Sequence, residues 1–392
     1  MEDLDTRADA RPLRPAIPAR VKRAVSYLIA RTTESVLPSD VVARMRTARE
    51  WRRWVDSLTP ETLADLTEAA PEMKRRVFKA QVRRVEIETH AICNRICSFC
   101  PNVLMDRRLN QTLTDAQVLN RVFEELGAID YAGQIAVARY SEPLANRPYL
   151  YERLACARAL VPQAQLCITT NTDYLTPGVL DKLEELGLNV VYMSLYLRDR
   201  ERWSIELARA YTERLAKKLG AQLLTKVERP TNLLATYRYK GLDLRSTCHN
   251  WDQYGTDRGG SLAQYKLQER IGPCRDPFET FVVDYNGSVV PCCAIRSDLR
   301  EHRDLVVGNL SVPGTSIFDV YAGRLSVWRR SMVGFGKRDF PCTTCRHRDL
   351  PAKLVAPISR HLERHLHQIG RAADYRPPVG ESEERETVLT AR

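Results

Sequence analysis

The sequence of 392 residues predicts an α/β protein in which a partial (β/α)6 barrel lies between an N-terminal helical extension and a small C-terminal cysteine-rich module. Three observations predict this. Strand patterns alternate with helix patterns between residues 83 and 239, which indicates a parallel sheet with helical crossovers. Residues 21–80 show helical spacing alone, and the last third holds a second cysteine group. Six strands are enough for a curved, open barrel and too few for a closed eight-stranded one.

The chain is expected to divide into five segments. We predict a disordered N-terminus, a helical extension with a capped helix start at Thr59-Pro60, the barrel, the cysteine-rich module, and a C-terminal helix with a disordered tail. These segments are residues 1–20, 21–80, 81–260, 261–350 and 351–392, respectively.

The expected barrel elements alternate in chain order. The predicted strands are 85–88, 134–140, 165–170, 189–197, 222–227 and 233–239. The predicted helices are 112–126, 149–160, 177–186 and 202–219. In the module, Tyr285-Asn286-Gly287 is typical of a hairpin turn. Two further helices are expected at 317–330 and 352–370.

Composition excludes several classes of protein. No run of apolar residues reaches the roughly 18 needed to span a membrane, and the N-terminus lacks a signal-peptide pattern. The net charge of +11 is spread along the chain without a basic stripe, so nucleic acid binding is not expected. Eleven cysteines, an odd number, in a chain without an export signal favour metal ligands in a reducing cytoplasm over disulfides.

The first cysteine group is a C-x3-C-x2-C array directly after a predicted strand, formed by Cys93, Cys97 and Cys100. Three thiolates on one loop can hold a [4Fe-4S] cluster while leaving one iron without a protein ligand. That open iron could bind a chelating small molecule and pass it an electron. A zinc site would normally need a fourth ligand nearby.

This array resembles the motif of the radical S-adenosylmethionine (SAM) enzymes, C-x3-C-x-aromatic-C. Phe99 fills the aromatic position, which in that family lies beside the adenine of SAM. Ser141-Glu142-Pro143 is similar to the family's Gly-Glu-Pro stretch, which receives the methionine amino group, although serine replaces the usual glycine. Asn171 and Ser194 resemble positions that contact the SAM carboxylate or ribose.

The second group resembles the SPASM/Twitch extensions of the same superfamily. Cys274, the G-x4-C stretch ending at Cys292, and the C-x2-C pair Cys342 and Cys345 imply four ligands to one auxiliary [4Fe-4S] cluster. No cysteine follows, which matches the shorter Twitch form. Cys293 is surplus and is expected, within a strand, to point away from Cys292. A zinc knuckle is the alternative for these four thiols.

The resemblance implies a function. SAM would be reduced and cleaved to a 5′-deoxyadenosyl radical, which removes a hydrogen atom from the substrate. With one auxiliary cluster to accept an electron, the expected outcome is oxidation of a secondary alcohol of a sugar or aminocyclitol to a ketone in natural-product biosynthesis. The chain resembles the aminocyclitol dehydrogenase group of the butirosin pathway in its cysteine spacing. The expected partners are a small-molecule substrate and a flavodoxin- or ferredoxin-type reductant.

Two other reactions stay open. An epimerase would need a thiol to return a hydrogen atom, and Cys248, expected in the loop after the last barrel strand, is the candidate. A peptide-modifying maturase is also possible for this superfamily, although the helical character of residues 21–80 counts against it. The residues do not identify the proton acceptor. Lys226, Arg139, Tyr140 and Tyr196 are expected near strand ends.

Overall fold

The computed structural model of the protein describes residues 39–197, 201–265 and 268–377. The predictions for residues 1–20 and for the end of the tail lie outside them. Residues 1–53 and 54–392 form two compact units, and each is described by itself. The described part of the predicted helical extension is helical, with α2 (Ser39–Ser57), α3 (Pro60–Leu63) and α4 (Pro71–Gln81). Thr59 caps α3 as predicted, because its hydroxyl accepts a hydrogen bond from the Thr62 backbone N–H.

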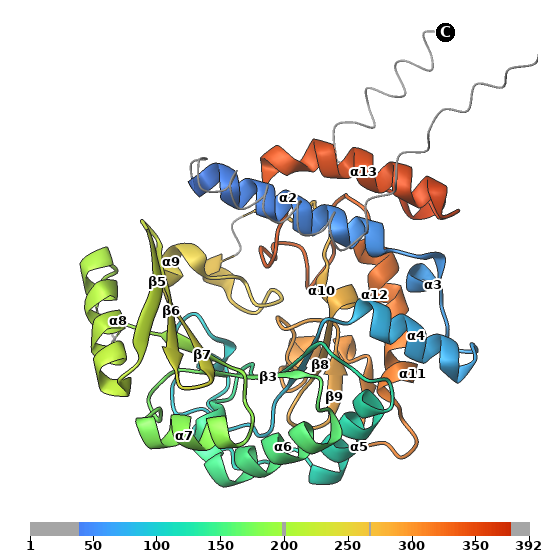
Figure 1. The fold of residues 1–392 in the computed structure, drawn as a ribbon. Helices are drawn as coiled ribbons and strands as arrows, with labels where there is room; N and C mark the ends of the chain where they lie inside the picture. The colour runs from blue at the N-terminus through green and yellow to red at the C-terminus, as the bar shows by residue number, and fades with distance from the viewer. Residues whose placement is uncertain (1–38, 198–200, 266–267, 378–392) are drawn as a thin grey trace, which may run out of the picture. The chain divides into compact units, whose positions relative to one another are not determined.

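One ten-stranded sheet forms the centre of the second unit (Figure 1). Its strand order is β10-β9-β8-β1-β2-β3-β4-β7-β6-β5. The six central strands are parallel, which agrees with the predicted partial barrel. They are β8 (Thr280–Val283), β1 (Arg84–Ile87), β2 (Gln134–Val137), β3 (Gln165–Thr170), β4 (Val190–Leu195) and β7 (Leu242–His249).

The predicted fifth and sixth barrel strands are not parallel strands. β5 (Gln222–Arg229) and β6 (Asn232–Tyr239) are antiparallel and form one edge of the sheet. Only Pro230 and Thr231 separate them, and a two-residue connection permits a hairpin but no crossover. The fifth parallel strand is β7, which the sequence interpretation placed in a loop, and the sixth is β8 from the cysteine-rich module.

The cysteine-rich module is continuous with the barrel. β8 and β9 (Ser288–Val290) form the predicted antiparallel hairpin, and Gly287 adopts the positive φ of 75° that its turn requires. β8 also pairs with β1, in parallel, and β10 (Gly308–Asn309) pairs with β9 at the edge. The predicted boundary near residue 260 therefore does not separate two sheets.

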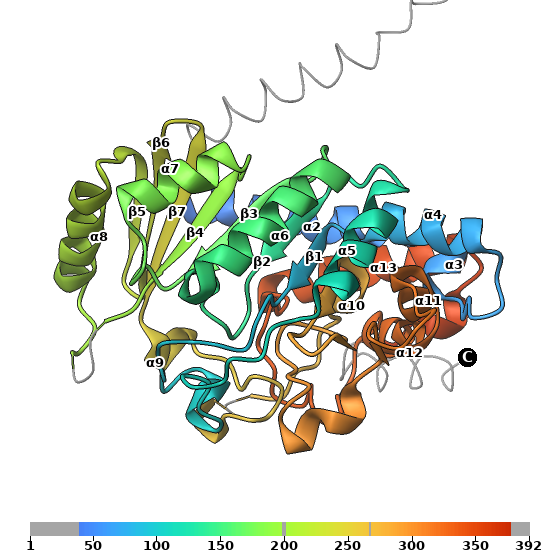
Figure 2. The same cartoon turned by 90° about the horizontal axis from the view of Figure 1, so that it is seen from below.

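Four helices cover the outer face of the curved sheet, as Figures 1 and 2 show. They are α5 (Ala116–Gly127), α6 (Arg147–Leu160), α7 (Pro177–Glu185) and α8 (Ile205–Leu219). Each begins at a side chain that accepts a hydrogen bond from a first-turn backbone N–H, namely Asp115, Asn146, Thr176 and Ser204. Their apolar faces and the sheet share one large buried core, which fixes the strand ends on the opposite side.

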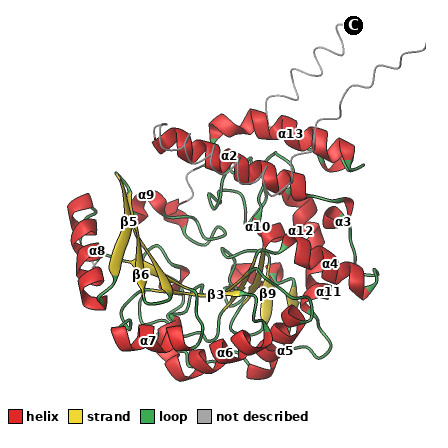
Figure 3. Cartoon of the chain, viewed as in Figure 1, coloured by secondary structure: helices red, strands yellow, loops and turns green. Residues whose placement is uncertain are grey.

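The C-terminal part is helical and rich in loops (Figure 3). Its helices are α9 (Trp251–Tyr254), α10 (Asp276–Glu279), α11 (Ile317–Ala322), α12 (Arg324–Met332) and α13 (Val355–Gln368). The single helix predicted over 317–330 is broken at Gly323, where a Cβ would lie 3.0 Å from the Asp319 carbonyl oxygen. No helix in the described ranges is both long and apolar enough to cross a membrane.

Candidate metal centres and active site

The predicted site residues gather at the carboxyl ends of the parallel strands. The loop with Cys93, Cys97 and Cys100 follows β1, and Ser141-Glu142-Pro143 follows β2. Asn171 follows β3 directly, and Ser194 is the penultimate residue of β4. Carboxyl ends of parallel strands meet at one edge of the sheet, so residues from four chain segments converge there.

The first cysteine loop is fixed by polar contacts. The Cys100 backbone N–H donates to the Cys97 carbonyl oxygen over 2.9 Å. The Arg95 guanidinium donates to both oxygens of Asp173, at 2.6 and 2.7 Å, and therefore ties the loop to the segment after β3. Burial raises the pKa of Cys93 to about 11, so this thiol stays protonated at neutral pH until a metal displaces the proton.

Glu142 joins two of the predicted SAM-binding segments. Its Oε1 accepts hydrogen bonds from the Thr170 hydroxyl at 2.7 Å and the Leu144 N–H at 3.2 Å, and its Oε2 accepts one from the Asn171 N–H at 2.7 Å. Burial raises the pKa of Glu142 to about 7, although the hydrogen bonds from Asn171 and Thr170 oppose this rise. A carboxylate can accept about four hydrogen bonds, and the Glu142 carboxylate accepts three within the chain. The remaining position could accept a hydrogen bond from an ammonium group.

Two further observations fit a bound ligand beside Glu142. The Ser141 hydroxyl is buried and has no hydrogen-bond partner in the described part of the chain. The Asn171 side-chain amide donates to the Asn94 side-chain Oδ1 over 2.7 Å, so the Glu142 segment is linked to the first cysteine loop. The Pro143 carbonyl oxygen lies 3.4 Å from His90 Nε2.

The second cysteine group comes from three chain segments. Cys274 precedes α10, Cys292 follows β9, and Cys342 and Cys345 follow α12. Burial raises the pKa of Cys345 to about 12 and also raises the pKa of the other three thiols. Burial removes these four thiols from water and opposes their ionisation. A bound metal cluster would stabilise them as thiolates, so this set of sulfur ligands fits a metal cluster.

A buried arginine assembles this second group. Arg270 donates through its guanidinium to the carbonyl oxygens of Pro273 at 2.6 Å, Cys345 at 3.1 Å and His347 at 2.8 Å. Its backbone N–H donates to the Thr343 carbonyl oxygen. One side chain thus holds the segment before Cys274 against the C-x2-C loop.

The spacing of the sulfur atoms bears on whether a single zinc ion could bind to these cysteines. Zinc bound at about 2.3 Å by thiolates brings its ligand atoms to within about 4 Å of one another. Across the described ranges, the sulfurs of the seven proposed cluster ligands form no group of three within 4.8 Å of one another. In the described residues, the sulfur positions therefore give no support to a zinc ion held by three of these cysteines.

Comparison with known families agrees with these two groups. A model of the radical SAM superfamily matches residues 87–218, and a model of SPASM, an iron–sulfur cluster-binding domain, matches residues 274–346. The chain carries a radical SAM domain and a SPASM domain. The predicted resemblance is confirmed at this level, and the two domains imply [4Fe-4S] clusters.

Two curated relatives match part of this chain. The S-adenosyl-L-methionine-dependent 2-deoxy-scyllo-inosamine dehydrogenase of Niallia circulans is 34% identical over 104 residues, which is 26% of this chain. The FeMo cofactor biosynthesis protein NifB of Klebsiella pneumoniae is 25% identical over 152 residues, which is 37% of this chain. The matches span 41% and 32% of the relatives' own lengths.

Solved structures also align with the chain. BtrN in complex with AdoMet and 2-DOIA is 22% identical with a TM-score of 0.46, over 64% of this chain and 87% of that one. The anSMEcpe protein with bound AdoMet is 12% identical with a TM-score of 0.37, over 73% of this chain and 97% of that one.

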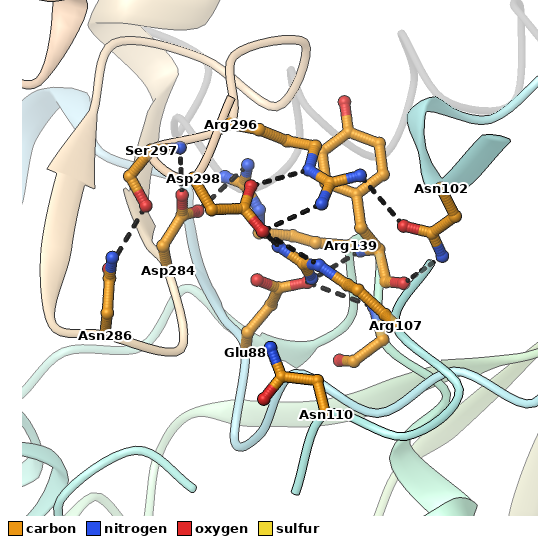
Figure 4. Close-up of polar contacts among 12 residues, drawn as sticks. Glu88, Asn102, Arg107, Asn110, Arg139, Asp284, Asn286, Arg296, Ser297 and Asp298 are labelled. Atoms are coloured by element: carbon orange, nitrogen blue, oxygen red, sulfur yellow. Dashed lines mark hydrogen bonds and ion pairs between the residues drawn. The ribbon is translucent and has the colours of Figure 1, made fainter. Parts of the chain in front are cut away.

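A buried network of charges links the radical SAM domain to the SPASM domain (Figure 4). Arg107, seven residues after Cys100, donates to Glu88 at 2.9 Å and to Asp298 of the SPASM domain at 2.8 Å. Arg296 donates to the other oxygen of Asp298 at 2.8 Å and to Asn102 at 2.9 Å. The side chains of Arg107 and Glu88 are fully buried, so these contacts hold the two cysteine loops in a fixed relation.

The same network fixes the end of β2. Glu88 accepts hydrogen bonds from the backbone N–H groups of Tyr140 and Ser141, at 2.9 and 3.0 Å. Arg139 forms a buried ion pair with Asp284 at 3.0 Å, and Tyr140 donates its hydroxyl to the Cys293 carbonyl oxygen at 2.8 Å. Arg139 and Tyr140, two of the proton-acceptor candidates, therefore have structural partners.

A cavity of about 650 Å³ opens beside the first cysteine loop. Its wall is aromatic, because Phe99 stacks on Trp251 with ring centroids 4.1 Å apart and Tyr196 lies 5.0 Å from Phe99. Arg95, Arg108 and Asp252 contribute charges of both signs to the wall. Aromatic faces with polar groups around them suit a polyol or a nucleoside.

The structure corrects the placement of two sequence candidates. Cys248 lies within β7 and not in a loop; it is fully buried in the main core, and burial raises its pKa to about 12. Lys226 lies on the edge strand β5, where it pairs with Glu228 at 3.0 Å. The premise that Cys293 lies in a strand is also wrong, because β9 ends at Val290.

Sequence interpretation missed Trp251, His249 and Arg258, all at or after the end of the unrecognised strand β7. His249 lines the cavity, and its Nδ1 is buried without a partner in the described residues. Burial lowers the pKa of His249 to about 4, so the imidazole is neutral at pH 7. Burial also lowers the pKa of Arg258, but the neighbouring groups, which include Tyr140 and Cys100, outweigh burial and raise it.

Proposed function

We propose that this chain oxidises a secondary alcohol of a sugar or aminocyclitol to a ketone in natural-product biosynthesis. The observation that carries the proposal is the pairing of an open set of three thiols with a closed set of four, joined by the buried charge network. A four-thiolate cluster has no free iron for substrate and suits electron transfer. The similarity of residues within this chain to a dehydrogenase of an aminocyclitol supports the same reaction class.

We assign the cluster ligands and SAM contacts to particular residues. Cys93, Cys97 and Cys100 would hold the cluster that SAM binds, and Cys274, Cys292, Cys342 and Cys345 would hold the auxiliary one. The SAM-binding side chains in this proposal are Phe99, Ser141, Glu142, Pro143, Asn171 and Ser194. Bound SAM supplies, on one-electron reduction, the radical that abstracts a hydrogen atom from the alcohol carbon.

The protein residues have two tasks after that abstraction. The hydroxyl must lose its proton, and the remaining electron must pass to the auxiliary cluster. His249 is neutral at pH 7 and lines the cavity, so its imidazole can accept the proton. Arg258 lies near Cys100 of one group and Cys293 beside the other, and its cation would stabilise negative charge that develops on the substrate oxygen.

The test is anaerobic turnover with a panel of aminocyclitols and sugars, with SAM cleavage and ketone formation both counted. We expect one ketone for each SAM cleaved. A product at the oxidation level of the substrate, with inverted configuration, would contradict the dehydrogenase and favour an epimerase. Cys248→Ala should leave the ratio unchanged, because Cys248 is enclosed in the core.

We further propose a flavodoxin- or ferredoxin-type reductant and a cytoplasmic location, where thiols stay reduced. Apolar side chains are exposed just after the first cysteine loop, at Val103, Leu104, Met105 and Leu109. Arg108 is exposed among them and would favour an acidic donor. Leu104→Asp should slow reduction by flavodoxin without affecting reduction by dithionite, and equal rates with flavodoxin would contradict this docking surface.

A further inference from the structure

Beside the second cysteine group lie three side chains that the auxiliary cluster does not use. The His347 Nε2 lies 3.2 Å from the Asp276 Oδ2 and 3.5 Å from the Cys293 Sγ. The Cys293 Sγ lies 4.0 Å from the same Asp276 oxygen. The three atoms therefore form a compact triangle of one nitrogen, one oxygen and one sulfur.

Hydrogen bonds can join these three side chains without a metal, because the imidazole Nε2–H can donate to the Asp276 Oδ2 and the Cys293 thiol can donate to the same oxygen or to the imidazole. The thiol contact with Asp276 is long for such a bond, at 4.0 Å. Over the described ranges, this is the one place where three potential metal-ligand atoms lie within 4.8 Å of one another. A single cation at the centre would satisfy all three atoms at once.

We propose that Asp276, Cys293 and His347 bind one zinc ion, separate from both iron–sulfur clusters. Zinc binds thiolate sulfur at about 2.3 Å and imidazole nitrogen or carboxylate oxygen at about 2.0–2.2 Å, with roughly tetrahedral angles. Ligand atoms at those lengths lie about 3.3–3.8 Å apart, close to the observed triangle. A mixed set of sulfur, nitrogen and oxygen ligands suits zinc, whose affinity exceeds that of iron(II) for such sites.

The surroundings meet the further requirements of a metal site. The Asp276 Oδ1, which does not face the triangle, lies 3.2 Å from Arg348, and this contact orients the carboxylate. Tyr140 donates to the Cys293 carbonyl oxygen and so fixes the backbone that carries the thiol. The His347 side chain is 31% exposed, which provides a route for the ion and space for water as a fourth ligand.

The position of the triangle explains the surplus cysteine of the motif. Cys293 follows a cluster ligand directly, Asp276 lies two residues after Cys274, and His347 lies two residues after Cys345. The same three segments that supply the cluster ligands thus supply one zinc ligand each. The zinc would brace these segments against one another, whatever alcohol the enzyme oxidises.

The test is the metal content of the full chain, isolated anaerobically with both clusters in place. We expect about one zinc per chain in addition to about eight irons and eight acid-labile sulfides, since a lone zinc ion brings no sulfide. X-ray absorption at the zinc edge should show one sulfur at about 2.3 Å and lighter ligands at about 2.0 Å.

Variants assign the zinc to the triangle. His347→Gln and Cys293→Ser should lose the zinc and keep iron and sulfide. His361→Gln is the matched control, because His361 also lies beside an aspartate, Asp56 at 2.7 Å, but among the described residues no third potential metal ligand lies within 4.8 Å of both. Wild-type protein without zinc, or zinc retained in both variants, overturns the proposal. If a variant also loses iron, the X-ray absorption spectrum at the zinc edge of the wild-type protein tests the proposal instead. A zinc ion without a sulfur ligand in that spectrum overturns the proposal.

Discussion

The two cysteine groups differ in how the chain assembles them. The first group lies within eight residues of one loop, and its three thiols are partly buried beside a cavity. The second group is brought together from three segments between residues 274 and 345, and Arg270 joins two of them, those of Cys274 and Cys345, by hydrogen bonds to carbonyl oxygens. A cluster held by the three cysteines of one loop would leave one iron without a protein ligand, where a bound molecule can be exchanged. A cluster held by four cysteines from distant segments would have no such open iron and is suited to a permanent role in electron transfer.

The largest expected difference comes from removing one thiol from each group. Cys97→Ser should abolish SAM cleavage, because the cluster that binds SAM would lose one of its three ligands. Cys342→Ser should keep SAM cleavage but lose ketone formation, because the electron acceptor would be absent. Anaerobic assays of 5′-deoxyadenosine and ketone, with iron counts for each variant, separate the two results. Equal loss of both products in both variants would mean that the groups do not have distinct roles.

The next effect concerns the buried network between the groups. Arg107→Met should lower the free energy of unfolding by about 3–5 kcal/mol, because it leaves Glu88 as a buried carboxylate without its ion-pair partner and removes one of the two arginines that bind Asp298. Urea denaturation under anaerobic conditions measures the change. Lys182→Met, which removes an exposed pair with Glu185, serves as the control and should change stability by less than about 1 kcal/mol. Similar small effects in both variants would show that the network does not brace the loops.

A smaller effect is expected at the SAM-binding edge of the first group. Glu142→Gln should weaken SAM binding by about 10- to 100-fold, because a neutral amide replaces the carboxylate that would bind the ammonium group. Anaerobic calorimetry measures the affinity. Glu185→Gln on the exposed surface of α7 should leave it unchanged. Unaltered affinity in Glu142→Gln would remove this residue from the SAM site.

The smallest effect is a dependence of SAM affinity on pH. Burial raises the pKa of Glu142 to about 7, so the free carboxyl is protonated below that pH and ionised above it. Binding of an ammonium group requires the ionised form, so SAM binding should release a proton below pH 7. The dissociation constant should then rise by up to about tenfold for each pH unit below 7. Glu142→Gln should abolish this dependence.

Both cysteine groups could be predicted from the sequence, but for different reasons. The spacing of Cys93, Cys97 and Cys100 is local, so the first group and its place after a strand were recognisable directly. The second group was recognisable only through its resemblance to a known extension. The helix start at Thr59 and the hairpin at Gly287 were also predicted, because side-chain capping and turn conformations depend on neighbouring residues.

One error had a local signal, and the others came from interactions between distant residues. The short connection between β5 and β6 allows only an antiparallel hairpin, whereas the pairing of β6 with β7 depends on a later segment. Missing β7 placed Cys248 in a loop and hid His249, which the strand carries to the cavity. The pairing of Arg107 with Asp298, 191 residues apart, leaves no signal in the spacing of either residue.

The parallel pairing of β8 with β1 has a consequence for engineering this enzyme. Their residues lie roughly two hundred positions apart in the chain, so this pairing contributes a high contact order and must await synthesis of the C-terminal third. Cutting the chain near residue 260 would expose the backbone groups of Arg84–Ile87 along an unpaired edge, which invites aggregation. An exchange of auxiliary modules between related enzymes therefore has to carry β8 along, with side chains matched to the first strand of the recipient.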